Sequence, residues 1–120
     1  GGLYVVESEQ TPPNPYLEIT DRDLVATNGK RLTMINPAYM TRQMAGTILE
    51  QTGIRVHITS LKPINPGNRA DEWELAALRS FESGLREFAE IVPGREPLLR
   101  YMGPLVTQQA CVTCHATQGY

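Results

Sequence analysis

Apolar residues recur along this chain in two kinds of pattern, one typical of short strands and the other of amphipathic helices. The β-branched, apolar segment 3–7 predicts a strand, and so do segments 23–27 and 31–35. The last two flank Asn28-Gly29, a dipeptide that readily supplies the two positive φ angles of a type I′ turn. We therefore expect a hairpin or a tight loop at this point.

The first helix is predicted over residues 37–52. Asn36 suits the N-cap, Pro37 suits the first turn, and Gly53 falls where a left-handed C-cap would lie. Apolar positions spaced four residues apart share one face of this helix, and we expect that face to be buried: Met40, Met44 and Ile48.

The second half of the chain continues with strands and one more helix. Segment 54–61 alternates between apolar and polar residues and predicts a half-buried strand. Segment 71–83 predicts a helix with an acidic first turn, ended by Gly84. Segments 87–92 and 98–106 predict two strands joined by a turn that contains Pro-Gly.

This order of elements predicts a single α+β domain over residues 1–120, built around one antiparallel sheet with flanking helices. The short strands and nine prolines argue against a four-helix cytochrome. The formal net charge is -2, with basic residues scattered, so nothing points to nucleic acid or an anionic membrane surface as a partner. No apolar run approaches the roughly 20 residues of a membrane span.

The only two cysteines of the chain lie in the run Cys111-Val112-Thr113-Cys114-His115. C-x-x-C-H is the attachment signature of a c-type haem: each thiol bonds to one vinyl group, and the histidine binds the iron. A thiol–disulfide redox pair, a zinc site completed by carboxylates, and a plain disulfide are the alternatives. We interpret the run as a covalent haem c site at residues 111–115, with His115 as the metal ligand. In a preparation made without haem maturation, the haem would be absent.

The sixth iron ligand is a separate question, and Met40 is our first candidate because a thioether suits haem iron. Met44 and Met102 offer the same chemistry, although methionine at helical spacing more commonly fills a core. His57 carries an imidazole but alternates out of phase with its apolar neighbours. Water is a further alternative, which would leave room for a gaseous ligand.

A few other side chains suit a haem pocket. Arg42 and Arg100 are candidates to pair with the propionates, because guanidinium binds carboxylate through two hydrogen bonds. Tyr101 and Trp73 could pack on the porphyrin, and the helical phase of Trp73 favours a place in the core instead. No catalytic triad or phosphate-binding loop is present in the sequence, so we expect no enzyme activity.

Six separated motifs together resemble the Tll0287-like family of haem-binding sensor domains, also called DUF3365. They are Asn14-Pro15-Tyr16-Leu17, Asn36 to Gln43, Ser60-Leu61-Lys62-Pro63 with Asn65-Pro66, Asp71-Glu72-Trp73-Glu74, Arg100-Tyr101-Met102, and Cys111 to His115 with Gln118-Gly119-Tyr120. The resemblance implies a PAS-like α+β domain on the extracytoplasmic side of a bacterial membrane receptor, usually a sensor histidine kinase and sometimes a chemotaxis receptor. It also implies that Cys111 and Cys114 bond the haem and that His115 binds its iron.

The resulting hypothesis is a periplasmic sensor domain of an inner-membrane receptor in a two-component or chemotaxis system. It would sense redox state or a small, gaseous ligand through the haem, and signal to an attached kinase or chemotaxis module, with a homodimer compatible with this role. We expect the export and anchoring segments to lie outside this sequence. The alternatives are a small monohaem c-type electron carrier, and a haem-free PAS-like module that binds a small molecule.

Overall fold

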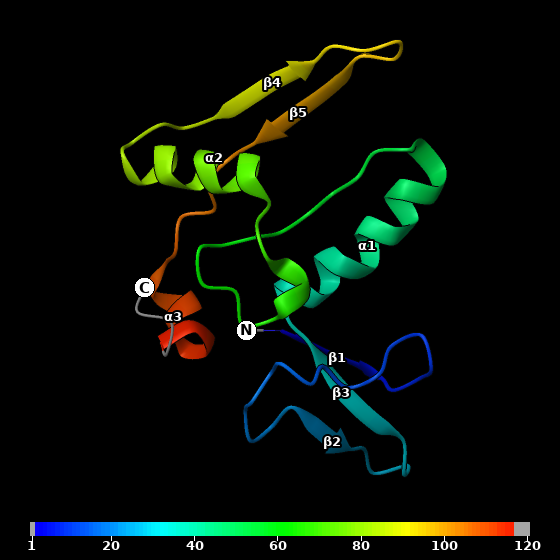
Figure 1. Ribbon diagram of the computed structural model, residues 1–120. Coiled ribbons are helices and arrows are strands. Elements are labelled where there is room, and N and C mark those ends of the chain that lie inside the picture. Colours follow the sequence, from blue (N-terminus) through cyan, green and yellow to red (C-terminus); the bar gives the residue numbers. More distant parts are fainter. Residues whose placement is uncertain (1, 117–120) are drawn as a thin grey trace. The chain divides into compact units, whose positions relative to one another are not determined.

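The computed structural model describes residues 2–116, with the backbone alone for residues 113 and 114, and Figure 1 shows its elements. Antiparallel strands and helices make up the described part, which confirms the expected α+β class. The elements in chain order are β1 (Leu3–Val6), β2 (Asp23–Val25), β3 (Arg31–Ile35), α1 (Pro37–Thr52), a 3-10 turn (Pro66–Asn68), α2 (Glu72–Glu82), β4 (Phe88–Val92), β5 (Leu98–Met102) and α3 (Gln109–His115).

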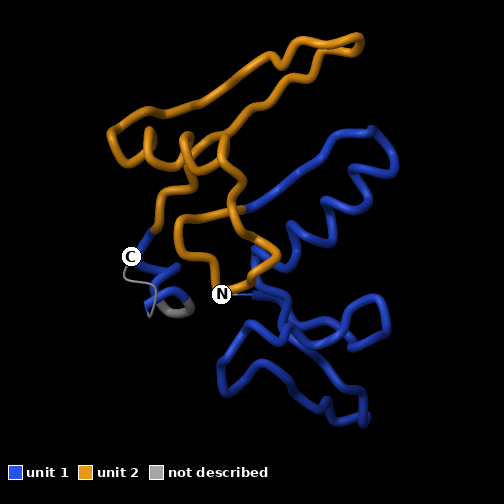
Figure 2. The backbone as a smooth tube through the Cα atoms, in the orientation of Figure 1, with its two compact units in different colours: residues 1–58, 108–120 blue, residues 59–107 orange. Residues whose placement is uncertain are grey.

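Contacts within the chain divide it into two compact units, drawn in two colours in Figure 2. Unit 1 comprises residues 1–58 together with 108–120, and unit 2 comprises residues 59–107. Each unit has its own antiparallel sheet: β1-β3-β2 in unit 1 and β4-β5 in unit 2. The prediction of one sheet for the whole chain was therefore wrong.

The three-stranded sheet of unit 1 is centred on β3. Leu3 pairs with Ile35 across β1 and β3, and Asp23 pairs with Thr33 across β2 and β3. Thr33 and Ile35 are buried, as an inner strand with neighbours on both sides requires.

The hairpin between β2 and β3 is confirmed, but its turn is not type I′. Within this turn only Gly29 has a positive φ, of 81°, whereas a type I′ turn needs a positive φ at Asn28 as well. The N–H of Gly29 donates to the carbonyl of Ala26 at 2.9 Å, and the N–H of Ala26 donates to the carbonyl of Lys30 at 2.9 Å. This pattern is the three-residue loop with glycine at its left-handed position. The Asn28 side chain instead accepts the N–H of Lys30.

The ends of α1 lie where the sequence places them. The Asn36 side chain accepts the N–H of Tyr39, and Gly53 closes the helix at φ 74° with its N–H on the carbonyl of Leu49. The expected burial of its apolar face was wrong: Met40 is 37% exposed and Met44 is 54% exposed. No residue of α1 is fully buried, so the apolar stripe is present but is only partly covered.

Segment 54–61 forms neither a helix nor a strand, apart from a single bridge between Ser60 and Arg69. The alternation of apolar residues suits a strand, but a strand exists only where a neighbouring strand takes its hydrogen bonds. None of the described strands pairs with this segment, and residues 54–57 are exposed. The predicted half-buried strand was therefore wrong.

Unit 2 combines α2 with the β4–β5 hairpin. The Asp71 side chain accepts the N–H of Glu74 at 2.8 Å, and the Glu74 carboxylate accepts the N–H of Asp71 at 2.8 Å, which together form a capping box. Gly84 follows the helix with φ 97°. The strand predicted over 98–106 ends earlier, at Met102, because Gly103-Pro104 follows.

Candidate functional site

The C-x-x-C-H run lies on α3 and fills most of that helix. Positions 111, 114 and 115 are related as i, i+3 and i+4, and in a helix such positions lie on one face. The backbone of α3 therefore places positions 111, 114 and 115 on one face of the helix. The sequence motif predicts this grouping only if it is helical, and the structure supplies the helix.

The thiol of Cys111 is free and exposed. Its sulfur lies 3.5 Å from the backbone nitrogen of Gln108, whose N–H donates to it, and the N–H of Cys111 donates to the carbonyl of Gln108 at 2.8 Å. The thiol thus takes one N–H left without a partner at the start of the helix. A free thiol at the surface is the state that thioether attachment requires.

His115 is half-buried in the last turn of α3. Among the residues that the structure describes, no group of three or more histidine, cysteine, aspartate or glutamate residues could hold a metal ion by itself. A haem iron needs only one ligand from this run, whereas a zinc ion needs about four ligands.

The candidates for the sixth ligand fall in both units. Met40 and Met44 lie on α1 and belong to unit 1, which also holds α3. His57 is exposed in the segment that forms no strand, so the alternation argument against it does not apply. Met102 ends β5 in unit 2. The grouping of α1 with α3 favours no single methionine, and Met40 stays a prediction.

The two arginines proposed for the propionates both have aromatic neighbours. The guanidinium of Arg42 lies 5.3 Å from the ring centre of Tyr39, within reach of a cation–π contact. Arg100 lies 4.3 Å from the Trp73 ring and 2.6 Å from a carboxylate oxygen of Asp71. Arg100 is therefore committed to the packing of unit 2, and Trp73 takes part in that packing, as its helical phase favoured.

A family comparison bears on this arrangement. The model of the Tll0287-like family matches residues 4–119, which include the whole C-x-x-C-H run and parts of both units. The chain belongs to the Tll0287-like family. No curated protein and no solved structure matches this Tll0287-like chain.

A polar cluster in unit 1 of the Tll0287-like domain was not anticipated from its sequence. Asp23 accepts hydrogen bonds from the Thr33 hydroxyl at 2.7 Å and from the Arg22 guanidinium at 2.5 Å, and Arg22 also donates to the carbonyl of Asn14. These hydrogen bonds lower the pKa of Asp23 below its ordinary value, and the one from Arg22 has the larger effect. The buried Asn14 opens the first motif of the family resemblance, and its side-chain oxygen accepts the N–H of Tyr16 at 3.1 Å, which accounts for a polar residue there.

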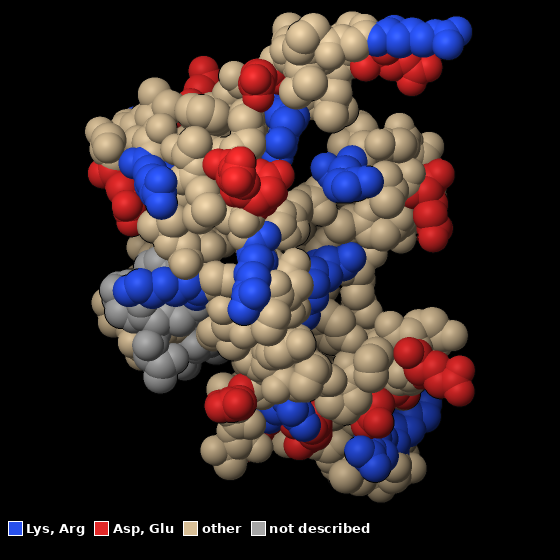
Figure 3. All heavy atoms as spheres, in the orientation of Figure 1, with Lys and Arg blue, Asp and Glu red and all other residues tan. Residues whose placement is uncertain are grey.

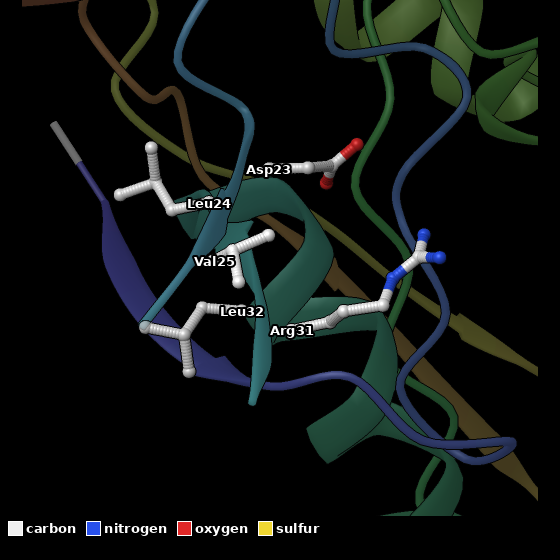
Figure 4. Close-up of a pocket in the computed structure, with 5 residues that line it drawn as sticks. All are labelled: Asp23, Leu24, Val25, Arg31 and Leu32. Carbon is white, nitrogen blue, oxygen red and sulfur yellow. The ribbon is translucent and has the colours of Figure 1, made fainter. Parts of the chain in front are cut away.

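A small hollow lies beside this cluster, lined by Asp23, Leu24, Val25, Arg31 and Leu32 (Figure 4). Its volume of about 160 Å³ is below the roughly 300–1,000 Å³ of typical small-molecule sites. Figure 4 shows Leu24 and Leu32 on one side of the strands and the charged side chains on the other. Arg31 is paired with Glu7 at 3.0 Å, so we assign no ligand to this hollow.

Acidic and basic side chains are interspersed on the face of the Tll0287-like domain that Figure 3 shows. This agrees with the scattered charges of the sequence and gives no broad basic surface on that face for nucleic acid. No helix within residues 2–116 combines the length and the apolar character needed to cross a bilayer.

Proposed function

We propose that this Tll0287-like domain is an extracytoplasmic sensor of a membrane-bound signal-transduction receptor, and that it holds a covalent c-type haem through Cys111, Cys114 and His115. The observation that carries the proposal is the C-x-x-C-H run on helix α3, in a chain matched by the Tll0287-like family over nearly its whole length. A sensor histidine kinase is the output module that the resemblance favours, with a chemotaxis receptor as the other.

The two cysteines would carry out the attachment. Each thiol adds across one vinyl double bond, so that a sulfur–carbon bond forms and the thiol hydrogen passes to the neighbouring carbon. This addition needs no oxidant or reductant beyond keeping both thiols reduced. The free thiol of Cys111 is consistent with that requirement.

His115 would bind the iron through its imidazole, one residue after the second attachment point. When bound, the haem supplies an iron that changes oxidation state or takes a small ligand. Met40 would be the second residue that holds the iron, because a thioether is a soft ligand suited to haem iron. If Met40 bound the iron in only one oxidation state, the two conformations of the domain would bind the two iron states with unequal affinity. A change of iron state would then shift the equilibrium between the conformations.

The attachment is tested by expressing the chain with the cytochrome c maturation machinery and measuring its mass after denaturation, together with its visible spectrum. We expect the mass of one haem to be added. The double variant Cys111→Ala/Cys114→Ala should add none, whereas Val112→Ala, a matched change between the two cysteines, should load normally. An unmodified wild-type mass, or haem retained by the double variant after denaturation, would overturn the covalent assignment.

The axial ligands are tested on the loaded protein. His115→Ala should change the visible spectrum, and Met40→Leu should lower the reduction potential, because methionine ligation raises it. Met44→Leu, four residues along the same helix, is the matched control and should leave both unchanged. An unchanged potential in Met40→Leu removes Met40 from the site.

The sensing role is tested by comparing backbone hydrogen exchange of the loaded chain with oxidised and with reduced iron. A sensor should show different exchange in the two states, since the iron state must bias the conformation. Identical exchange in both states, with no binding of carbon monoxide or nitric oxide, would contradict sensing and leave electron transfer as the role of the haem.

A further inference from the structure

The tip of the β2–β3 hairpin carries Asn28 directly before Gly29, and these two residues can react with each other. The side-chain amide of an asparagine is open to attack by the backbone nitrogen of the next residue, which closes a five-membered succinimide ring. Glycine favours this attack because it has no side chain to shield its nitrogen. The turn therefore brings an electrophile and a nucleophile together.

The other four asparagines of the chain lack such a neighbour. Asn14, Asn36 and Asn65 each precede a proline, whose nitrogen carries no hydrogen to lose and therefore does not close the ring. Asn68 precedes Arg69, whose side chain hinders the approach. The sequence thus favours the reaction at one position.

We propose that Asn28 is a site of spontaneous deamidation in the folded chain. The nitrogen of Gly29 forms a bond to Cγ of Asn28 and loses its proton, while the bond from Cγ to the amide nitrogen breaks and ammonia leaves. Water then opens the succinimide at one of its two carbonyls and gives aspartate or isoaspartate. One water enters and one ammonia leaves, so the reaction needs neither an oxidant nor a reductant.

The hydrogen bonds of the turn act on both reacting groups. Negative charge develops on Oδ1 of Asn28 during the attack, and the N–H of Lys30 already donates to this oxygen at 3.1 Å. A backbone donor directed at a developing oxyanion stabilises the transition state. The N–H of Gly29 donates to the carbonyl of Ala26 at 2.9 Å, and this bond opposes the reaction because the nitrogen must lose that proton.

The balance of these two hydrogen bonds sets the rate. Loss of one neutral backbone hydrogen bond slows a reaction by roughly tenfold at most, and a hydrogen bond to a charged oxygen is about twice as strong as a neutral one. We therefore expect the turn to slow deamidation by no more than about tenfold relative to the unfolded chain. Both reacting atoms lie in one turn of unit 1, so the reaction requires only water besides the turn itself.

Mass spectrometry of the full 120-residue chain after incubation at neutral pH tests the proposal. Trypsin releases residues 23–30, in which Asn28 is the only side-chain amide, and residues 32–42, in which Asn36 before Pro37 is an internal control. The 23–30 peptide should gain the mass difference between an amide and an acid, as two products that chromatography separates, and the 32–42 peptide should gain none. A methyltransferase that recognises isoaspartate should label only one product.

The rate in the native chain is then compared with the rate in guanidinium chloride, where the turn is absent. A native rate within about tenfold of the unfolded rate supports the proposal. A slower native rate overturns it, because the turn then protects Asn28. Asn28→Ser should abolish the mass gain of the 23–30 peptide, whereas Asn68→Ser, the matched control, should age as the wild type does.

Isoaspartate at position 28 would also loosen the hairpin. It places Cβ in the main chain and adds one atom between Ala26 and Lys30, whose N–H and carbonyl close the loop at 2.9 Å. By NMR, the isoaspartate form of the aged chain should exchange its amide hydrogens at Ala26 and Gly29 faster than Asn28→Asp, which reproduces the other product. The β4–β5 hairpin of unit 2 should exchange equally in both. Equal exchange at Ala26 and Gly29 would contradict this consequence.

Discussion

Arg100 joins the helix and the hairpin of unit 2, and replacing it gives the sharpest test of that packing. Its guanidinium lies 4.3 Å from the centre of the Trp73 ring and 2.6 Å from a carboxylate oxygen of Asp71. Both contacts are partly exposed, with 30% of the Arg100 side chain and 52% of the Asp71 side chain accessible. Exposure limits what each contact contributes to stability.

The two contacts can be separated by two substitutions. Arg100→Lys keeps the charge beside Asp71 but loses the planar stack on Trp73, which should cost about 0.5–1 kcal/mol. Arg100→Met also loses the ion pair with Asp71, which at an exposed site contributes about 0.2–1 kcal/mol more. Arg100→Met should therefore cost about 0.7–2 kcal/mol in total. The cost of Arg100→Met should shrink at high salt because salt screens the ion pair, whereas the cost of Arg100→Lys should not.

Urea unfolding followed by tryptophan fluorescence measures these costs, since the single tryptophan, Trp73, reports on unit 2. The matched control is Arg95→Lys at the exposed turn of the same hairpin, which should stay within about 0.5 kcal/mol of the wild type. If Arg100→Lys unfolds at the same urea concentration as the wild type, the stack on Trp73 contributes nothing and the reasoning fails.

Three further predictions concern stability. Thr33→Val removes the hydroxyl that donates to Asp23 at 2.7 Å from a fully buried position, so we expect a loss of about 1–2 kcal/mol in chemical unfolding, together with a rise in the pKa of Asp23 by NMR titration; an unchanged pKa would contradict the hydrogen bond. Gly53→Ala places a Cβ at φ 74° and should cost about 1 kcal/mol, measurable as a lower melting temperature, whereas Gly46→Ala within the same helix should not destabilise it. The pKa values of Asp23 and Asp71 are lowered from 3.8, so the folded state binds fewer protons than the unfolded state; stability should be constant above about pH 5 and fall as the pH drops through 4, and Asp71→Asn should flatten that fall.

Local signals in the sequence predicted the helix ends well. Asn36 and Gly53 bound α1, and Asp71 with Glu74 closes the start of α2. Each of these signals acts through hydrogen bonds to residues within a turn of itself, so no knowledge of the tertiary structure is needed to interpret them. The C-x-x-C-H run is local in the same sense, because one helical turn of backbone is enough to place its three positions on one face.

Predictions that depend on a distant neighbour fared worse. The alternation in segment 54–61 is compatible with a strand, but the residues of the segment do not show whether another strand lies beside it. The division into two sheets likewise depends on which strands pair, and strands that pair can be far apart in the sequence. The cluster around Asp23 brings Asn14 and Thr33 together from separate segments, and neither residue shows this partnership in the order of the sequence.

The same distinction separates the two sides of the proposed haem site. Cys111 and His115 are fixed relative to each other by a helix of seven residues, so the attachment side is set by local structure. A second protein ligand would have to come from elsewhere in the chain. The error over the α1 face matters here, because a methionine sulfur buried in a core would have to leave its packing to bind iron, at the cost of a cavity. Met40 and Met44 are instead partly exposed, so the thioether of either residue could bind iron without leaving a cavity in a core. Exposure thus weakens the explanation that these methionines serve only as core filling, and it makes the paired Met40→Leu and Met44→Leu measurements decisive for the ligand.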